Sequence, residues 1–186
     1  EPSNSPALVR RLGDKAVVTD IEAGDYVFIA KGIRGPGIDG TVGLEHKKAQ
    51  DLAACIVYSA RHLDQLRRMR TYYDESRLLI SDRIVPSPEG LASVRRRNQM
   101  GRMEHMPIHP PGSPSATITY SRYQKHLYTL EELLGVRVME CDGQQIAAQK
   151  ILLLAEWWLT EPQKHTSWLA EYKPQALSPF GSARPS

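Results

Sequence analysis

The sequence has few of the features that mark membrane, secreted or zinc-binding proteins. No apolar run approaches the roughly 20 residues that a transmembrane helix needs, because the strongest run, residues 151–159, is short and contains Glu156. The first residues lack the apolar core of a signal peptide. The two cysteines, Cys55 and Cys141, fit neither a disulfide framework nor a zinc spacing. We therefore expect a cytoplasmic protein that does not span a membrane.

Apolar and charged residues, at 41% and 24%, are as frequent as in ordinary globular proteins. A chain of 186 residues is long enough for a proper core and short enough for one domain. Residues 1–7 and 174–186 are rich in Pro, Ser, Ala and Gly, which bury little apolar surface. We expect a single α+β domain over residues 8–173, with a flexible tail at each end.

Lysine is missing from residues 61–102, where ten arginines accompany only five acidic residues. A guanidinium group presents paired donors that suit phosphate oxygens, so this segment is a candidate DNA-binding region. Few aromatic residues accompany the arginines, so base stacking is not strongly indicated. A solvated helix face with local ion pairs is the alternative interpretation. The DNA-binding candidates are Arg67, Arg68, Arg95, Arg96, Arg97 and Arg102.

The first half of the chain combines short β-like runs with one long helical pattern. Residues 16–22 and 26–31 are typical of a hairpin, whereas the five glycines of residues 32–43 indicate a loop. From residue 45 to residue 73 apolar side chains recur every three or four positions, which predicts one long amphipathic helix. Strand pieces are expected at residues 78–81 and 84–85. Ser87 and Pro88 then favour a helix over residues 89–100.

The second half begins with a proline-rich, nonhelical segment, residues 103–115. His105 and His109 lie in it, but without a helix their spacing does not align two imidazoles on a metal. Residues 116–120 resemble a strand, and residues 121–134 a helix capped by Ser121 and closed by Gly135. A strand at residues 136–141, the pair Asp142 and Gly143, and a strongly apolar helix at residues 144–159 follow.

The junction at Asp142 and Gly143 is the main functional candidate. A strand, a tight turn and a helix leave the first helical amides without intrahelical partners, at the positive end of the helix dipole. Such a helix start stabilises an anion, above all a phosphate group. Gly143 allows close approach, and Gln144 and Gln145 offer amide donors. The alternative is an ordinary strand–helix connection in which Asp142 is only the N-cap.

The run of residues 140–154, ECDGQQIAAQKILLL, resembles a segment of the ParB/sulfiredoxin superfamily. There, a strand ends at an Asp-Gly turn, a basic pair follows, and the helix carries an alanine and a Lys-Leu pair. The matching positions here are Asp142, Gly143, Ala147 or Ala148, Lys150, Ile151 and Leu152.

Two departures from that pattern matter. Gln144 and Gln145 replace the basic pair, so the arginines of residues 61–102 are candidates to supply the positive charge. Cys141 precedes the turn, where a sulfiredoxin needs a cysteine after it, which argues against sulfinic acid reduction.

The resemblance implies a small mixed sheet packed with several helices, and a phosphate-handling activity. The length of this chain and its arginine-rich middle are also similar to those of plasmid fertility-inhibition proteins of bacteria. That similarity implies inhibition of conjugative DNA transfer through type IV secretion, with ATPase and DNase activities that use ATP and a divalent cation, expected to be Mg²⁺. The implied partners are DNA, a relaxase–DNA complex and the type IV coupling protein, and such partners would place the protein at the inner membrane.

Glu140 and Asp142 are the candidate catalytic residues and metal ligands of such an enzyme. Two residues apart on a strand, they can face one site and hold a cation that activates water. Glu104 and His105 are further candidates. The phosphate- or nucleotide-binding candidates are Gly143, Gln144, Gln145 and Lys150.

Two non-enzymatic alternatives stay open. The last long helix is apolar nearly all round, and Trp157, Trp158 and Trp168 lie near one another in the sequence, which marks either a protein interface or a core. An interface of this kind would block a transfer or partition partner. Alternatively, the arginines bind DNA without cleaving it, and the affinity then falls steeply with salt.

Overall fold

The computed structural model describes residue 10, residues 19–58 and residues 60–161. Over these residues the predicted α+β class is confirmed, with two sheets and several helices. The expected tails, Trp168 and residues 16–18 lie outside the described residues. No helix within the described residues is long and apolar enough to cross a membrane.

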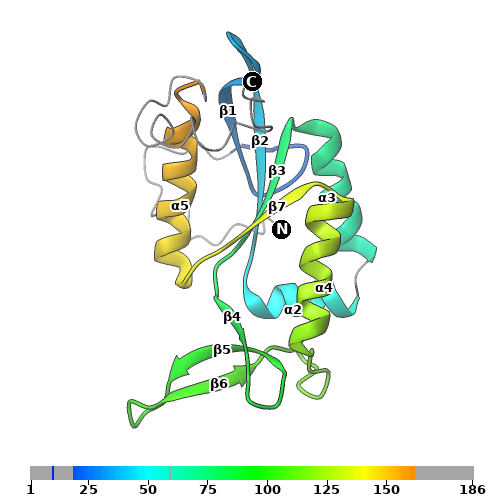
Figure 1. Cartoon of the computed structure of the whole chain (residues 1–186), viewed down its shortest axis with the longest axis vertical. Coiled ribbons are helices and arrows are strands. Elements are labelled where there is room, and N and C mark those ends of the chain that lie inside the picture. Colours follow the sequence, from blue (N-terminus) through cyan, green and yellow to red (C-terminus); the bar gives the residue numbers. More distant parts are fainter. Residues whose placement is uncertain (1–9, 11–18, 59, 162–186) are drawn as a thin grey trace, which may run out of the picture.

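A four-stranded mixed sheet in the order β1-β2-β3-β7 forms the centre of the molecule (Figure 1). Its strands are β1 (Tyr26–Gly35), β2 (Ile38–Lys47), β3 (Glu75–Ile80) and β7 (Val136–Glu140). The first two form an antiparallel hairpin, and β3 and β7 run parallel to β2. Lys47, Ile80 and Glu140 share one register. The carboxyl ends of three strands therefore meet at one edge, where sites in α/β sheets commonly form.

Helices cover both faces of this sheet (Figure 1). One face carries α2 (Ala49–Val57), α3 (Ala60–Tyr72) and α4 (Tyr120–Tyr128). Leu52, Leu66 and Tyr123 from these helices are buried against Leu78 and Ile80 of β3. The other face carries α5 (Gly143–Trp158), which packs through an apolar stripe. Because β3 is covered on both faces, its last three residues, Leu78 to Ile80, are consecutive buried apolar side chains rather than an alternating pattern.

A second, antiparallel sheet follows the carboxyl end of β3 (Figure 1). It consists of β4 (Ile84–Pro86), β5 (Ala92–Arg97) and β6 (Met103–Pro107). Ile84, Ala92 and Val94 anchor this small sheet because they belong to the same buried cluster as the core of the main sheet. The outer half of β5 is exposed and carries the three consecutive arginines.

The glycine-rich segment, residues 32–43, is not the predicted loop but the tip of the β1–β2 hairpin. The described partner of β1 is β2, and residues 19–22 of the predicted first hairpin strand, residues 16–22, are not in a strand, whereas residues 16–18 lie outside the described residues. A Cβ on Gly43 would overlap the ring of Tyr73, and one on Gly40 would overlap the carboxylate of Asp74. The glycines of β2 are therefore needed because other parts of the chain pack closely against this strand. In the sequence, the same glycines give the segment the composition of a loop.

The single helix predicted for residues 45–73 is wrong. The segment contains the end of β2 and two separate helices, and the spacing of its apolar residues shows neither the boundary between strand and helix nor the one between the helices. Glu45 and Lys47 belong to β2, where they pair with β3. α2 begins at Ala49, whose N–H donates to Asp82 Oδ2 at 3.0 Å, and ends at Val57, before α3 begins at Ala60. The apolar residues of a strand end that is buried on both faces can match the spacing expected for a helix. The periodicity of apolar residues alone therefore does not distinguish such a strand end from a helix.

The helix predicted for residues 89–100 is also wrong, because this segment contains β5. Ser87 closes a turn instead of starting a helix: its Oγ accepts from the Leu91 N–H at 3.2 Å, and Gly90 has a φ of +78°. Pairing with strands on both sides overrides the local helical preference. The strand predicted at residues 116–120 is reduced to one bridge between Thr119 and Leu91.

Other predicted elements are confirmed. The strand pieces at residues 78–81 and 84–85 correspond to β3 and β4. The helix at residues 121–134 is α4 followed by a π-helical turn (Thr129–Leu133), and it ends at Gly135, which has a φ of +63°. Its N-cap is Thr119, which accepts from the Arg122 N–H at 3.2 Å, rather than Ser121. β7 and α5 follow as expected.

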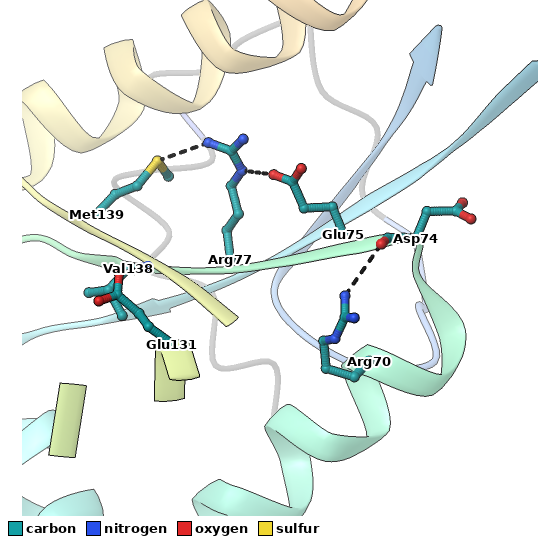
Figure 2. A network of polar contacts seen from close by, with 7 residues as sticks. All are labelled: Arg70, Asp74, Glu75, Arg77, Glu131, Val138 and Met139. Atoms are coloured by element: carbon teal, nitrogen blue, oxygen red, sulfur yellow. Dashed lines mark hydrogen bonds and ion pairs between the residues drawn. The ribbon is translucent and has the colours of Figure 1, made fainter. Parts of the chain in front are cut away.

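Several polar groups of the main sheet are satisfied locally (Figure 2). Arg77 on β3 is largely buried, pairs with Glu75, and donates to Met139 Sδ at 3.5 Å. At β7, the Val138 N–H donates to Glu131 Oε1 at 3.2 Å, which protects the outer edge of the sheet from pairing with another chain. Arg77 therefore has a structural role, which separates it from the exposed arginines considered below.

Candidate active site

Two acidic residues, Asp25 and Glu45, and one lysine, Lys47, lie together at the carboxyl end of β2. Glu45 and Lys47 are two residues apart on the strand, so both point to the face covered by α2 and α3. Gln65 of α3 confirms this orientation, because its amide donates to Glu45 Oε2 at 2.7 Å. Asp25 precedes β1, and its Oδ2 accepts from the main-chain N–H of His46 at 2.8 Å. Two segments 20 residues apart thus bring two carboxylates and one ammonium group together.

The loop before β1 is fixed from two sides. The Asp25 N–H donates to the Leu44 carbonyl at 2.9 Å, and the Tyr73 hydroxyl donates to the Ala23 carbonyl at 2.8 Å. Gly24 has a φ of +83°, and a Cβ there would lie 3.2 Å from the Leu44 carbonyl oxygen. The position of Asp25 therefore depends on a glycine conformation and on contacts with the end of α3.

Glu45 carries a charge in an unfavourable place. Its side chain is fully buried and pairs with Lys47. Burial, and then the negative charge of Asp25, raise the pKa of Glu45 to about 7, although Lys47 and Gln65 act in the opposite direction. Burial by itself lowers the pKa of Lys47, but Glu45 outweighs it, and the net pKa of the lysine lies above its usual value. Lys47 is therefore an ammonium group at neutral pH, whereas the pKa of Glu45 is shifted towards neutral pH.

A cavity of about 1120 Å³ opens over Lys47 between the loop before β1 and the two helices α2 and α3. Asp25 and Glu45 do not line it themselves. They lie next to residues that do, since Gly24 precedes Asp25, and Lys47 and Gln65 contact Glu45. The volume is sufficient for a nucleotide-sized ligand. The polar and charged lining of the cavity includes Lys47, Arg61, His62, Asp64, Gln65 and Arg68.

His62 lines the same cavity as a buried imidazole. It stacks on His126 with ring centroids 6.0 Å apart, and within the described residues neither of its ring nitrogens has a hydrogen-bond partner. Burial lowers the pKa of His62 to about 4, and Lys47 and His126 act in the same direction. His62 is therefore neutral at pH 7, and protonating it in the folded protein is unfavourable.

We expect His62 to stabilise the folded protein less at pH 5 than at pH 7. The unfolded chain takes up a proton on His62 near pH 6.5, whereas the folded protein does so only near pH 4, so the contribution of His62 is full above pH 6.5 and about 2 kcal/mol smaller at pH 5. Because the ionisation of Glu45 acts in the opposite direction over the same range, urea unfolding of wild type is compared with His62→Leu, whose stability at pH 5 relative to pH 7 should be about 2 kcal/mol higher. His109→Gln is the control, and the same pH dependence in wild type and His62→Leu would contradict the expectation.

The predicted pair Glu140 and Asp142 lies at the end of β7, beside a pocket of about 370 Å³ that Arg83 and Lys150 also line. The two carboxylates thus share one pocket. However, the Tyr123 hydroxyl donates to Glu140 Oε1, so one oxygen of Glu140 is engaged by α4. Asp142 is exposed at the N-cap position of α5 and makes no side-chain capping bond. A catalytic or metal-binding role for this pair stays a prediction.

The expectation of unpaired amides at the start of α5 is wrong for Gly143. Its N–H donates to the Ser81 carbonyl at 2.8 Å, because the chain after β3 runs alongside the turn. Lys150 Nζ donates to the Glu140 carbonyl at 2.6 Å, which ties the helix to the strand end. Gln144 is half-buried and Gln145 exposed. The first amide of the helix, the Gly143 N–H, is thus already engaged within the protein. A phosphate-binding role for Gly143, Gln144, Gln145 and Lys150 stays a prediction.

The predicted DNA-binding arginines fall on two separate surfaces. Arg67 and Arg68 are exposed on α3, where Arg67 pairs with Asp64 at 2.9 Å and Arg68 donates to the Glu22 carbonyl at 3.1 Å. Arg95, Arg96, Arg97 and Arg102 belong to the small sheet and its hairpin, and all are exposed. Arg95 and Arg96 share a pocket with Asp142 and Gly143, as the sequence-based hypothesis of an arginine supply for the turn requires.

The remaining candidates are placed by local contacts. Glu104 accepts from Asn98, and His105 Nδ1 lies 2.9 Å from Ser93 Oγ. His109 Nδ1 lies 3.1 Å from the Pro110 carbonyl oxygen. Among the described residues, no group of three or more His, Cys, Asp or Glu side chains is arranged to hold a metal ion. Trp158 is buried near Ala30 and Val42, whereas Trp157 is 39% exposed.

The sequence contains one signal for the site that was missed. In the segment Leu44 to Lys47, an acid and a base stand two residues apart, and an aspartate follows a glycine 20 residues before the acid. Opposite charges two residues apart face the same side of a strand but not of a helix. A single helix over residues 45–73 would place Glu45 and Lys47 on different sides of its first turn, so that prediction does not bring the two charges together.

Comparison with solved structures identifies the same fold in XPF from Aeropyrum pernix. One structure matches with a TM-score of 0.50 and 19% identity, over 95% of this chain and 69% of the other. A second, XPF from the same organism in complex with DNA, matches with a TM-score of 0.51 and 17% identity, over 96% and 70%. No family model matches the sequence, and no curated protein matches it. At this identity the likeness shows the fold alone.

The resemblance to the ParB/sulfiredoxin superfamily, and with it to the plasmid fertility-inhibition protein Osa, is therefore wrong. It rested on about fifteen residues around Asp142. A strand, an Asp-Gly turn and an amphipathic helix form a connection that many α/β proteins contain, so the local similarity did not determine the fold.

Proposed function

We propose that the protein is a metal-dependent nuclease that hydrolyses phosphodiester bonds of DNA, with Asp25, Glu45 and Lys47 as its catalytic group. The observation that carries the proposal is Glu45, a fully buried carboxylate whose pKa is raised to about 7 by burial and by Asp25, beside an ammonium group that lines a cavity. Strongly shifted titrating groups beside a cavity are typical of active sites. DNA as the substrate is supported by the arginines of the cavity and by the fold shared with a DNA-bound XPF.

Two carboxylates are ligands of the kind that a divalent cation takes in proteins. Their mutual repulsion is part of the cause of the raised pKa of Glu45, and a cation bound by both would remove it. Mg²⁺ is bound in proteins through one or two carboxylates, with water and substrate phosphate completing its shell. Asp25 and Glu45 would hold this ion, which would polarise the phosphate and lower the pKa of bound water.

Lys47 and Gln65 act on the substrate side of the site. Lys47 retains its proton at neutral pH, so it donates hydrogen bonds and positive charge to a phosphoryl oxygen rather than accepting a proton as a base. The amide of Gln65 donates to Glu45 Oε2 and holds the carboxylate in one orientation. Arg61 and Arg68 line the same cavity, where they are placed to bind neighbouring phosphates of the strand.

The proposal leaves out two expectations drawn from the family resemblance. Inhibition of conjugative transfer and ATP hydrolysis lose their support together with the ParB/sulfiredoxin resemblance, as do the relaxase–DNA complex and the coupling protein as partners. A nucleotide at Asp142 and Gly143 stays a prediction that binding measurements with ATP can test. Glu140 and Asp142 are the alternative metal ligands, and Asp142→Ala distinguishes them from Asp25 and Glu45.

The direct test is cleavage of labelled single-stranded, duplex and forked oligonucleotides with Mg²⁺ or Mn²⁺, and with EDTA. We expect cleavage only with the metal ion, and a loss of about 100-fold or more in Asp25→Asn, as for removal of one preorganised electrostatic group. Asp20→Asn, an exposed residue of the same loop, is the matched control and should stay within about 2-fold of wild type. Unchanged cleavage in Asp25→Asn, or no cleavage of any substrate by wild type, would overturn the proposal.

A further inference from the structure

We infer that a second pocket, formed where the small sheet meets the carboxyl edge of the main sheet, binds a phosphate of the nucleic-acid strand other than the one that is cleaved. This inference rests on the proposed function, because it identifies how the nuclease holds its substrate. The pocket has a volume of about 550 Å³. It is distinct from the cavity over Lys47, with which it shares no lining residue.

The pocket is built by three parts of the chain that are distant in sequence. Arg83 comes from the segment between β3 and β4, Arg95 and Arg96 from β5, and Asp142 and Gly143 from the junction before α5. Three guanidinium groups therefore line one concave surface. A planar guanidinium donates two parallel hydrogen bonds to phosphate oxygens, so several around one pocket suit a phosphodiester better than an isolated surface arginine does.

The three arginines of the pocket outnumber its two acids, Asp82 and Asp142. Within the described part of the chain, the guanidinium groups of Arg83 and Arg96 form no hydrogen bond or ion pair, and Arg95 Nε makes one long contact of 3.5 Å with His105 Nε2. Asp82, one of two acids in the pocket, accepts from the Ala49 N–H at 3.0 Å and is partly neutralised by the start of α2. An excess of positive charge is left for a ligand.

The pocket and the catalytic group belong to the same edge of the sheet. The Ser81 N–H donates to the Lys47 carbonyl at 3.0 Å, and the next residue, Asp82, both lines the pocket and contacts α2. Lys47 and Glu140 are in register on either side of Ile80. A strand that is cleaved beside Lys47 can therefore continue over the ends of β3 and β7 towards the small sheet, where the arginines bind its backbone.

Binding of labelled oligonucleotide in EDTA, followed by fluorescence anisotropy, tests the pocket without cleavage. For the full chain carrying Arg83→Gln and Arg96→Gln, we expect the affinity at 0.1 M salt to fall about 10-fold or more, and the slope of log affinity against log salt to fall by about two. The matched control is Arg70→Gln with Arg137→Gln, two exposed arginines outside both cavities, which removes the same charge and should lower affinity less than about 3-fold.

Competition separates the two sources of phosphate. Inorganic phosphate and ATP are added to the wild-type complex and to the Arg83/Arg96 variant. Weak competition by both supports a site for the nucleic-acid backbone. Tight ATP binding that the variant loses, with oligonucleotide affinity unchanged, would overturn the assignment to nucleic acid in favour of a nucleotide. Equal losses in the pocket variant and the control variant, or no loss in either, would overturn the pocket itself.

These outcomes are distinct from those of the cleavage test. If Asp25→Asn cleaves normally, the catalytic assignment fails, whereas the binding result for Arg83 and Arg96 stands. If cleavage requires Asp25 but the pocket variant binds like wild type, only the phosphate pocket fails. Thermal unfolding of each variant shows that a loss of binding does not reflect a loss of folding, since all four arginines named in the test are exposed.

Discussion

Replacing Glu45 with Gln is expected to lower the rate of DNA cleavage by about 1000-fold or more, and to remove a loss of stability that wild type undergoes as the pH rises from 4.5 to 7. The pKa of Glu45 is about 7 in the folded protein, against an ordinary value of 4.5. The unfolded chain therefore releases this proton at lower pH, so Glu45 lowers stability progressively from pH 4.5 to pH 7, by about 3 kcal/mol in all. Glutamine resembles the protonated side chain and avoids that loss.

Urea unfolding and cleavage rates measured on the same samples check both parts of this expectation. Glu132→Gln, at an exposed position, is the control and should change neither. Lys47→Met should also stop cleavage, but it should lower stability, because it leaves a buried carboxylate without its partner. Normal cleavage by Glu45→Gln, or the same loss of stability between pH 4.5 and pH 7 as in wild type, would contradict the role given to this residue.

Wild-type cleavage should depend on pH and metal together. At low Mg²⁺ concentration the rate should rise as the pH passes about 7, where Glu45 becomes ionised. Because a cation and a proton compete for the same carboxylate, a saturating concentration of Mg²⁺ should move this rise to lower pH. Rates measured from pH 5.5 to pH 8.5 at two Mg²⁺ concentrations test this, and a pH profile unaffected by Mg²⁺ would argue against cation binding by Glu45.

Gly43→Ala is expected to have the largest effect on stability of any single methyl addition in the β1–β2 hairpin. A Cβ at this position would overlap the ring of Tyr73. The ring has to move, and its hydroxyl then loses the bond to the Ala23 carbonyl that fixes the loop before Asp25. Overpacking of this kind costs about 3 kcal/mol, and cleavage should fall together with stability because Asp25 shifts.

Thermal and urea unfolding measure this effect against two comparisons. Gly37→Ala adds a methyl group in open space at a φ of +72°, so its cost of about 1 kcal/mol is that of the backbone alone. Gly43→Ala combined with Tyr73→Leu should be less destabilised than the sum of the two single changes, because the second removes the clash. Additive effects would show that the ring of Tyr73 does not restrict Gly43.

Local sequence signals were sufficient to predict those helices and strands whose structure is decided by residues near them in the sequence. The strand at residues 136–141, the helix that follows it, and the helix closed by Gly135 were predicted because each has a clear apolar period and a glycine at a φ that other residues avoid. The elements predicted wrongly are those decided by distant partners. Residues 92–97 form a strand because β4 and β6 lie on either side.

The sequence by itself determined the fold class, the absence of a long apolar helix from the described residues, and the segregation of arginines away from lysine. Only the tertiary structure decided the candidate site. Asp25, Glu45 and Gln65 come from a loop, a strand and a helix, and they meet because β2 pairs with β1 on one side and β3 on the other. Side chains converge through such long-range pairing, which the spacing of residues along a chain does not encode.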